Sequence, residues 1–396
     1  MKPETLTKPA SPARLPRFVL SHAAAGFIAI LVGYSSAAAI VFQAAQAAGA
    51  GPAEIASWMW ALGIGMGVSS IALSLRYRMP ILTAWSTPGA ALLATGLAGV
   101  PMAQAIGAFL FASLLITIAG ASGWFERLMH HVPRSLAAAL LGGVLLRFGI
   151  EVFVTLPDQG WIVGSMLTIF LLARRVLPRY AVPVTLLTGL IVAASRGEIH
   201  ASALALEFAR PLFIMPAFSI TTLIGVGIPL FIVTMASQNV PGLAVLRANG
   251  YQPPASPLIG WTGFTGVLLA PFGGYAYNLA AITAAICMSK DVDADSAQRY
   301  RAAIWAGGFY LLAGLFGATV AGLFAAFPHA LVLSIAGLAL LGTIGNSLAT
   351  ALGDEKERDA ALITFLAAAS GFSLWGIGSA FWALLLGLVT AKLARR

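Results

Sequence analysis

Long apolar runs alternate with short polar or Pro/Gly-rich breaks along almost the whole chain of 396 residues. We divide this pattern into about fourteen segments, at 18–47, 53–75, 80–98, 101–121, 133–152, 160–177, 180–196, 217–248, 256–270, 271–289, 299–325, 328–351, 358–373 and 375–393. A regular helix needs about 20 apolar residues to cross a bilayer. The pattern therefore predicts an all-α polytopic membrane protein with about fourteen transmembrane segments.

Composition excludes the main soluble alternatives. Hydrophobic residues make up 59% of the chain and charged residues only 9%, whereas soluble domains carry roughly 25% charged residues. The net charge of +9 comes from short clusters between apolar runs, so no nucleic-acid partner is expected. A single cysteine, Cys287, allows neither an internal disulfide nor a thiolate metal cluster, and we expect no cofactor.

Charge asymmetry predicts the orientation. With the amino terminus inside, this division places all but three of the 23 lysines and arginines on the inner side. The three exceptions are Arg147, Arg196 and Arg210. This bias is the positive-inside pattern. Residues 1–17 are polar and Pro-rich and lack the apolar core of a secretory signal. We therefore expect a cytoplasmic tail, both termini in the cytoplasm, and a multi-pass protein of the bacterial inner membrane.

The two halves of the chain resemble each other. VPRSLAAALLGGVLL (132–146) and FPHALVLSIAGLALL (327–341) share a proline followed by Leu, Gly and Leu at the same offsets. Pro133 begins the fifth segment and Pro328 the twelfth, an odd number of segments apart, so the halves would be inserted in opposite orientations. One short match also arises by chance in a chain rich in Ala and Leu. We interpret it as a 7+7 inverted repeat, the plan of many secondary transporters.

The third and tenth segments predict two half-helices that meet at the membrane midplane. In the third, residues 83–87 suit an extended segment and Pro88 suits the first turn of a helix. In the tenth, Pro271 and the Gly273–Gly274 pair break the chain, and a helix is expected to start near Tyr275. Two helix N-termini would form an anion site without a buried cation. Ordinary kinks with interfacial tyrosines are the alternative.

Mid-membrane polar residues supply the candidate binding groups. The eighth segment contains TMASQNVPG (234–242), whose Pro-Gly pair is typical of a helix break and whose residues 234, 238 and 241–242 would share one helix face. The candidate substrate-binding residues are Gln238, Asn239, Tyr275, Tyr277, Asn278, Ser86, Thr87, Gly89, Tyr34 and Gln43. Contacts between helices are the alternative role, and we assign it to Ser35, Ser36 and Ser237.

Four stretches together resemble the BenE family of benzoate/proton symporters: GYSSAAAIVFQAA, STPGAALL, SQNVPG and PFGGYAYNLAAITAAIC. The resemblance covers essentially the whole chain. It implies secondary active import of benzoate or a similar aromatic carboxylate, with a proton, by alternating access. The aromatic residues near the two breaks, Trp85, Phe272, Tyr275 and Tyr277, would suit such a substrate.

More distantly, the architecture resembles nucleobase/ascorbate and sulfate-type anion carriers. That likeness implies a core domain (18–132 and 217–326) that moves against a gate domain (133–216 and 327–396), and a possible homodimer. Nucleobase carriers have acidic residues where Gln238 and Tyr277 stand here, and like charges would repel a carboxylate. A nucleobase or inorganic anion as substrate, an anion channel and a membrane enzyme remain the alternatives, although HExxH and GxSxG motifs are absent.

The proton site stays open. Glu151 is the candidate, although Arg147 four residues earlier would also suit an ion pair with it. We place Asp158 in an outer loop and His329, at the start of the twelfth segment, at the inner face. The substrate can also carry the proton itself, and sodium coupling is not excluded.

Overall fold

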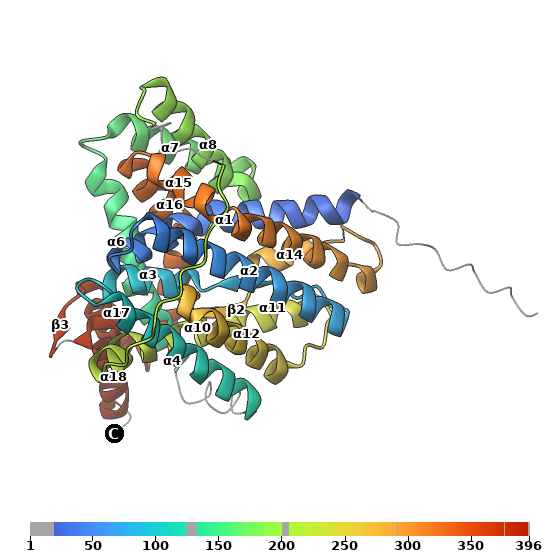
Figure 1. The fold of residues 1–396 in the computed structure, drawn as a ribbon. Coiled ribbons are helices and arrows are strands. Elements are labelled where there is room, and N and C mark those ends of the chain that lie inside the picture. Colours follow the sequence, from blue (N-terminus) through green and yellow to red (C-terminus); the bar gives the residue numbers. More distant parts are fainter. Residues whose placement is uncertain (1–19, 124–132, 200–205, 291, 376, 395–396) are drawn as a thin grey trace, which may run out of the picture.

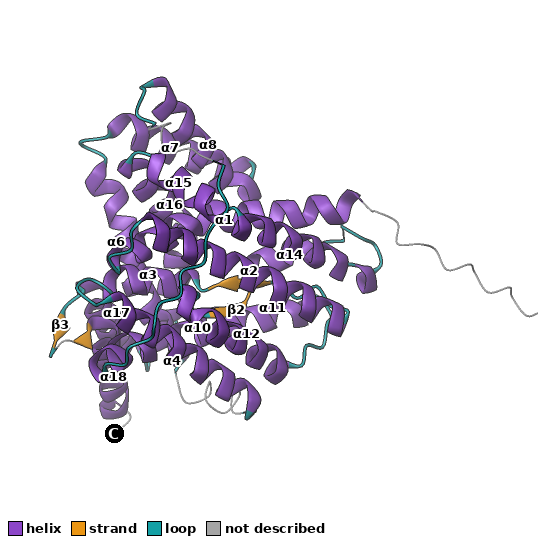
Figure 2. Ribbon diagram, viewed as in Figure 1, coloured by secondary structure: helices purple, strands orange, loops and turns teal. Residues whose placement is uncertain are grey.

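The computed structural model describes residues 20–123, 133–199, 206–290, 292–375 and 377–394, so the expected tail at 1–17 lies outside it. Helices dominate, as predicted, but four short strands form two antiparallel pairs (Figures 1 and 2). The chain is therefore mostly helical, with two strand pairs, and only the strand near residues 83–87 was expected. Both pairs lie at Pro/Gly-rich breaks, where the backbone must find hydrogen-bond partners outside a helix.

The helices of the first half are α1 (Leu20–Ala47), α2 (Pro52–Tyr77), α3 (Thr87–Gly96), α4 (Met102–Ala121), α6 (Arg134–Thr155), α7 (Gly160–Val176) and α8 (Ala181–Ser195). A 3-10 turn, η1 (Pro178–Tyr180), precedes α8. The strand β1 (Thr83–Trp85) lies between α2 and α3. Extended backbone was expected from the sequence at 83–87; it is confirmed for Thr83–Trp85, whereas Thr87 already belongs to α3.

The second half begins with one continuous helical run composed of α9 (Ile220–Thr222), η3 (Leu223–Gly227), α10 (Ile228–Thr234), η4 (Met235–Asn239) and α11 (Val240–Ala248). There follow α12 (Ala255–Leu269), η5 (Ala270–Phe272), β2 (Tyr277–Leu279), α13 (Ile282–Cys287), η6 (Ser296–Gln298), α14 (Tyr300–Leu315) and α15 (Gly317–Ala326). The chain ends with α16 (His329–Leu352), α17 (Arg358–Ser370), β3 (Ser373–Leu374), β4 (Ile377–Gly378) and α18 (Ser379–Ala394).

Six helical runs in the described residues are long and apolar enough to cross a membrane, or up to eight if each of two bent pairs is one span. The expected fourteen segments therefore remain a prediction. The difference comes from the short elements: α3 has 10 residues, α17 has 13, and α13 has only 6. These lengths fall below the ~20 residues that a regular spanning helix needs.

The eighth segment does not break at its Pro-Gly pair, contrary to the expectation. Instead, η3 and η4 are π-helical turns: Ile228 N–H donates to Leu223 O, and Val240 N–H donates to Met235 O, each five residues back. A proline stands two residues after each turn, at 229 and 241. Proline has no N–H and its ring clashes with the carbonyl four residues earlier. The wider turn absorbs this conflict, so the helix continues.

Close helix pairs join the two halves of the chain. The helix α2 packs on α14, α4 packs on α12, and α6 packs on α16. Glycines allow the approach: a Cβ on Gly63 would lie 2.5 Å from the Cα of Gly314, and one on Gly120 would lie 2.5 Å from the Cα of Gly260. Small residues at such contacts let membrane helices gain dispersion energy without a hydrophobic driving force.

Candidate functional site

The strands β1 and β2 form a short antiparallel ladder inside the helices, with Thr83 opposite Leu279 and Trp85 opposite Tyr277. Backbone hydrogen bonds extend it at both ends, from Ser86 N–H to Ala276 O (3.1 Å) and from Ala280 N–H to Leu82 O (2.8 Å). Pairing of this kind satisfies backbone groups that no water reaches. The ladder therefore makes extended backbone stable between α2 and α12, both of which contact β2.

The helix α3 starts at Thr87, with Ser86 as its N-cap. The Oγ atom of Ser86 accepts a hydrogen bond from Gly89 N–H at 3.0 Å, and Pro88 lies in the first turn. Ser86 and Gly89 are buried, whereas Thr87 is half-buried. A Cβ on Gly89 would lie 2.7 Å from Leu230 Cδ1, so glycine also lets the α3 start approach α10.

The expected helix start near Tyr275 is wrong. Tyr277–Leu279 form the strand β2 because they pair with β1, and α13 starts only at Ile282. By the register of the ladder, α3 and α13 begin at its opposite ends. Ala276 has a positive φ of 37°, which marks the turn into the strand.

The two tyrosines of this segment point into helix packing. Tyr277 is fully buried, and its hydroxyl donates to Ala61 O of α2 at 2.7 Å. Tyr275 is also fully buried, with its ring 6.0 Å from that of Trp58 and 5.7 Å from that of Phe109. Its hydroxyl has no hydrogen-bond partner among the described residues. Tyr275 therefore lies between α2 and α4, whereas Tyr277 lies against α2 and α12.

The neighbours Gln238 and Asn239 have different environments. Asn239 is fully buried; its Oδ1 accepts from Leu279 N–H at 2.9 Å, and its Nδ2 lies 3.2 Å from Met235 Sδ. Gln238 is half-buried and is in no hydrogen bond found among the described residues. Ser237 donates to Val233 O of its own helix, in line with its expected packing role.

The remaining predicted residues bring unpaired polar atoms into the interior. Within the described part of the chain, Tyr34 Oη, Gln43 Nε2 and Asn278 Oδ1 are buried without a hydrogen-bond partner. The Tyr34 ring lies 4.8 Å from that of Trp85 at the end of β1 and 6.1 Å from that of Tyr310 on α14. An aromatic cluster thus lies beside the strand ladder. Unpaired buried groups are costly and call for an explanation.

Sequence reasoning did not include Thr234 or Tyr310 among the site residues. Thr234 is fully buried, and its Oγ1 donates to Ser86 Oγ at 3.0 Å, which ties α10 to the start of α3. A threonine one turn before Gln238 was visible in the sequence, but its partner was not. Tyr310 lies in a long apolar helix and gives no local signal.

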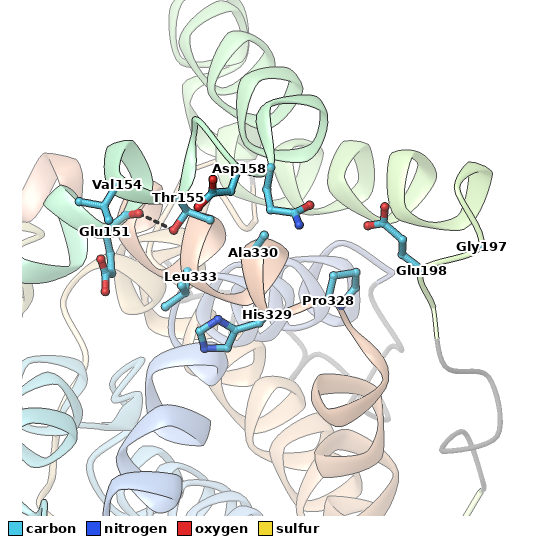
Figure 3. A pocket seen from close by; sticks show the side chains of 11 residues that line it. Glu151, Val154, Thr155, Asp158, Gly197, Glu198, Pro328, His329, Ala330 and Leu333 are labelled. Atoms are coloured by element: carbon cyan, nitrogen blue, oxygen red, sulfur yellow. Dashed lines mark hydrogen bonds between the residues drawn. The ribbon is translucent and has the colours of Figure 1, made fainter.

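Glu151 lies away from this ladder, at a cavity of about 670 Å³ (Figure 3). Glu151 and Asp158 come from the end of α6 and the following turn, His329 from the start of α16, and Glu198 from the segment after α8. Placing Asp158 and His329 on opposite faces was therefore wrong. Gly142 lies against Ser347 and Gly337 against Phe148, so α6 and α16 run antiparallel and the start of α16 lies beside the end of α6. The odd number of segments between Pro133 and Pro328 already required this arrangement, and the placement of His329 at the inner face did not follow it.

The ion pair considered for Arg147 and Glu151 is not among those formed by the described residues; Arg147 Nη1 lies beside Gly371 instead. In the same part of the chain, no group of three or more His, Cys, Asp and Glu side chains is arranged to hold a metal ion.

A family model described as benzoate membrane transport protein, BenE, matches residues 17–393. The chain belongs to the BenE family. It is 51% identical over 363 residues to the inner membrane protein YdcO of Escherichia coli, covering 92% of this chain and 93% of that protein. It is 38% identical over 370 residues to the benzoate membrane transport protein of Acinetobacter baylyi, covering 93% and 94%. BenE proteins are membrane transporters and not enzymes, so this chain is a multi-pass bacterial membrane transporter.

Solved structures show where the BenE fold belongs. The chain matches murine Slc26a9, an anion transporter in the inward-facing state, with a TM-score of 0.59 and 11% identity over 96% of this chain and 69% of that chain. It matches the transmembrane domain of the cyanobacterial bicarbonate transporter BicA with a TM-score of 0.52 and 14% identity, over 96% and 98%. At these identities the likeness shows a shared fold alone.

Proposed function

We propose that this BenE protein imports benzoate or a similar aromatic carboxylate by alternating access. The membership of the family over residues 17–393 carries the proposal, and the Acinetobacter relative named for benzoate supports it. The third and tenth segments, 80–98 and 271–289, contain no charged residue. Recognition of a carboxylate there would depend on N–H groups, hydroxyls and carboxamides.

The proposed substrate site is the space bordered by the start of α3 and by η4. Thr87 and Gln238 are half-buried, and α6 packs against both α3 and η4. Thr234 contacts Ser86, and Gln238, four residues further along the turn, would lie near the same side of η4. Its carboxamide would donate to the carboxylate, while Tyr34 and Trp85 would contact the ring of the substrate. These roles follow from position and chemistry.

We also propose the 7+7 inverted repeat, with core and gate domains as divided above and both termini cytoplasmic. The pattern of packing supports it. If segments one to seven correspond to segments eight to fourteen, α2 corresponds to α12 and α4 corresponds to α14. The packed pair α2–α14 then has its counterpart in the packed pair α4–α12. In the same way, α7–α8 corresponds to α17–α18, and both pairs are in contact. The hydrogen-bonded strands β1 and β2 exchange with each other.

Coupling to protons is part of the proposal, with sodium as the alternative. The strand ladder and the two segments that contain it carry no acid, so the proton would travel on the substrate or through a group elsewhere, such as Glu151 at its cavity. A neutral acid crosses a low-dielectric path at lower cost than its anion.

The test is uptake of labelled benzoate into proteoliposomes under imposed pH and sodium gradients. We expect accumulation above equilibrium driven by the pH gradient, abolished by a protonophore, and competition by salicylate but not by uracil or sulfate. Accumulation driven by sodium alone would refute proton coupling. Downhill benzoate flux without accumulation would indicate a channel. If benzoate is not taken up but uracil or sulfate binds, the substrate is a nucleobase or an inorganic anion instead of benzoate.

A further inference from the structure

The π-helical turn η4 is held at both ends by side-chain hydrogen bonds to the strand–helix break. At its amino-terminal end, Thr234 Oγ1 donates to Ser86 Oγ at 3.0 Å. At its carboxyl-terminal end, Asn239 Oδ1 accepts from Leu279 N–H of β2 at 2.9 Å. Gln238 lies between these two contacts. All three partners, Thr234, Ser86 and Asn239, are fully buried, so solvent does not compete with the bonds.

The Thr234 contact reaches the backbone of α3 through Ser86. Ser86 Oγ receives the Thr234 hydroxyl and at the same time accepts Gly89 N–H at 3.0 Å. A hydroxyl oxygen has two acceptor lone pairs, and both are used here. The position of η4 is thereby linked to the first turn of α3, one wall of the proposed substrate site.

The Asn239 contact fixes the rotation of the turn. A π turn adds one residue to a helical turn and so changes which side chains face a neighbour. Asn239 and Gly242 both contact Leu279 of β2: Asn239 Oδ1 accepts from its N–H at 2.9 Å, and a Cβ on Gly242 would lie 2.6 Å from its Cβ. The adjacent side of the turn, with Thr234, faces the start of α3, and Gln238 would lie near the same side. Gln238 is held there without making a hydrogen bond of its own within the described residues.

We propose that Thr234 and Asn239 are positioning residues: they fix the π turn between α3 and β2 so that the Gln238 carboxamide is presented to the substrate carboxylate. The inference rests on the proposed function. It assigns Asn239 a different role from direct binding, because both ends of its carboxamide already have partners inside the protein. Gln238 remains the group that contacts the substrate.

A double-mutant cycle on the purified full-length protein tests the inference, with the dissociation constant of benzoate as the readout. Gln238→Ala should raise it about tenfold, the size of one lost hydrogen bond to a charged group. Asn239→Ala should raise it by about threefold to tenfold, and the double variant should bind no more weakly than Gln238→Ala alone, because Asn239 acts through Gln238. Ser237→Ala, in the same turn, is the matched control and should leave the constant unchanged.

Thr234→Val and Thr234→Ser give a second arm that keeps the test decisive if Asn239→Ala does not fold. Valine has the shape of threonine but lacks the donor, whereas serine keeps it; we expect weaker binding for valine and rescue for serine. Multiplicative effects in the cycle would show that Asn239 contacts the substrate and would overturn the inference. Lower thermal stability with unchanged affinity would also overturn it. A wild-type protein that does not bind benzoate would overturn the proposed function, and the inference with it.

Discussion

At Gly242, α11 lies in close contact with β2. Substitution of Gly242 by alanine adds a single carbon atom at this contact. The added Cβ would lie 2.6 Å from Leu279 Cβ and 2.8 Å from Leu279 O. Carbon atoms pack at about 3.5–4.0 Å, so the helix must move away from the strand by roughly 1 Å. The strand cannot follow, because β2 is paired with β1 through residues 277–279.

The expected cost combines two opposing terms. Forcing an extra methyl group into a packed interior costs about 1–3 kcal/mol. Replacing glycine by alanine within a helix returns roughly 0.5–1 kcal/mol. We therefore expect a net loss between about 0 and 2.5 kcal/mol, with a middle value of about 1 kcal/mol. The same shift lengthens the bond between Asn239 and Leu279 N–H, so the affinity for benzoate should fall by about tenfold, the equivalent of ~1.4 kcal/mol.

The measurements are the Tm of the purified protein in detergent and the dissociation constant of benzoate. Gly308→Ala is the matched control: Gly308 lies within α14, and a Cβ there would meet no atom within 4 Å. It has the same gain in helix propensity without the clash, so its Tm should be equal to or above that of the wild type. If Gly242→Ala and Gly308→Ala have the same Tm and affinity, α11 and β2 are not packed as described.

Four further changes test other parts of the molecule. Ser86→Ala removes the cap of α3 and should lower stability by about 1 kcal/mol, seen as a lower Tm that Ser86→Thr restores in part. Arg299→Gln should lower Tm by more than Ser86→Ala does, because the buried guanidinium donates hydrogen bonds to the carbonyls of residues 288, 293 and 294. Burial raises the pKa of Tyr251 above its usual 10.0, although Arg299 acts in the opposite direction. The hydrogen bond from the Tyr251 hydroxyl to Ser296 O should therefore stabilise the folded protein fully below pH 10. This stabilisation should be lost as the pH rises through the raised pKa, because the hydroxyl loses its proton. The Tm difference between wild type and Tyr251→Phe should vanish there, and a difference constant with pH would contradict this. If Glu151 binds the coupled proton, Glu151→Gln should abolish benzoate uptake driven by a pH gradient but leave benzoate exchange intact. Unchanged uptake under a pH gradient would exclude Glu151 as the proton-binding group.

Periodicity and punctuation predicted much of the fold. The apolar runs identified α2, α4, α6 and α16 within a few residues, and the STP stretch placed Pro88 in the first turn of α3. Both signals are local: helix length follows from the apolar run, and proline in a first turn follows from its missing N–H. The four stretches that resemble the BenE family are also local features of the sequence.

The parts that failed depend on partners far away in the sequence. The PFGGYAYN stretch reads as a helix start near Tyr275, yet no helix starts there because Tyr277–Leu279 pair with residues 83–85. Pro241 reads as a helix break, yet the π turn before it keeps the helix intact. Gln238 and Asn239 are equivalent as a polar pair in the sequence. Only the position of Leu279 N–H distinguishes the buried, paired carboxamide from the half-buried one.

The strand ladder has a consequence for the assembly of the protein during synthesis. β1 is made early, but its partner β2 emerges from the ribosome roughly half a chain later, and so does α14, on which α2 packs. At about 5–20 residues per second, the delay is on the order of ten seconds or more. An extended segment cannot face lipid with free N–H and C=O groups. The β1 segment must therefore be shielded from lipid, or adopt another conformation, until the second half of the chain arrives.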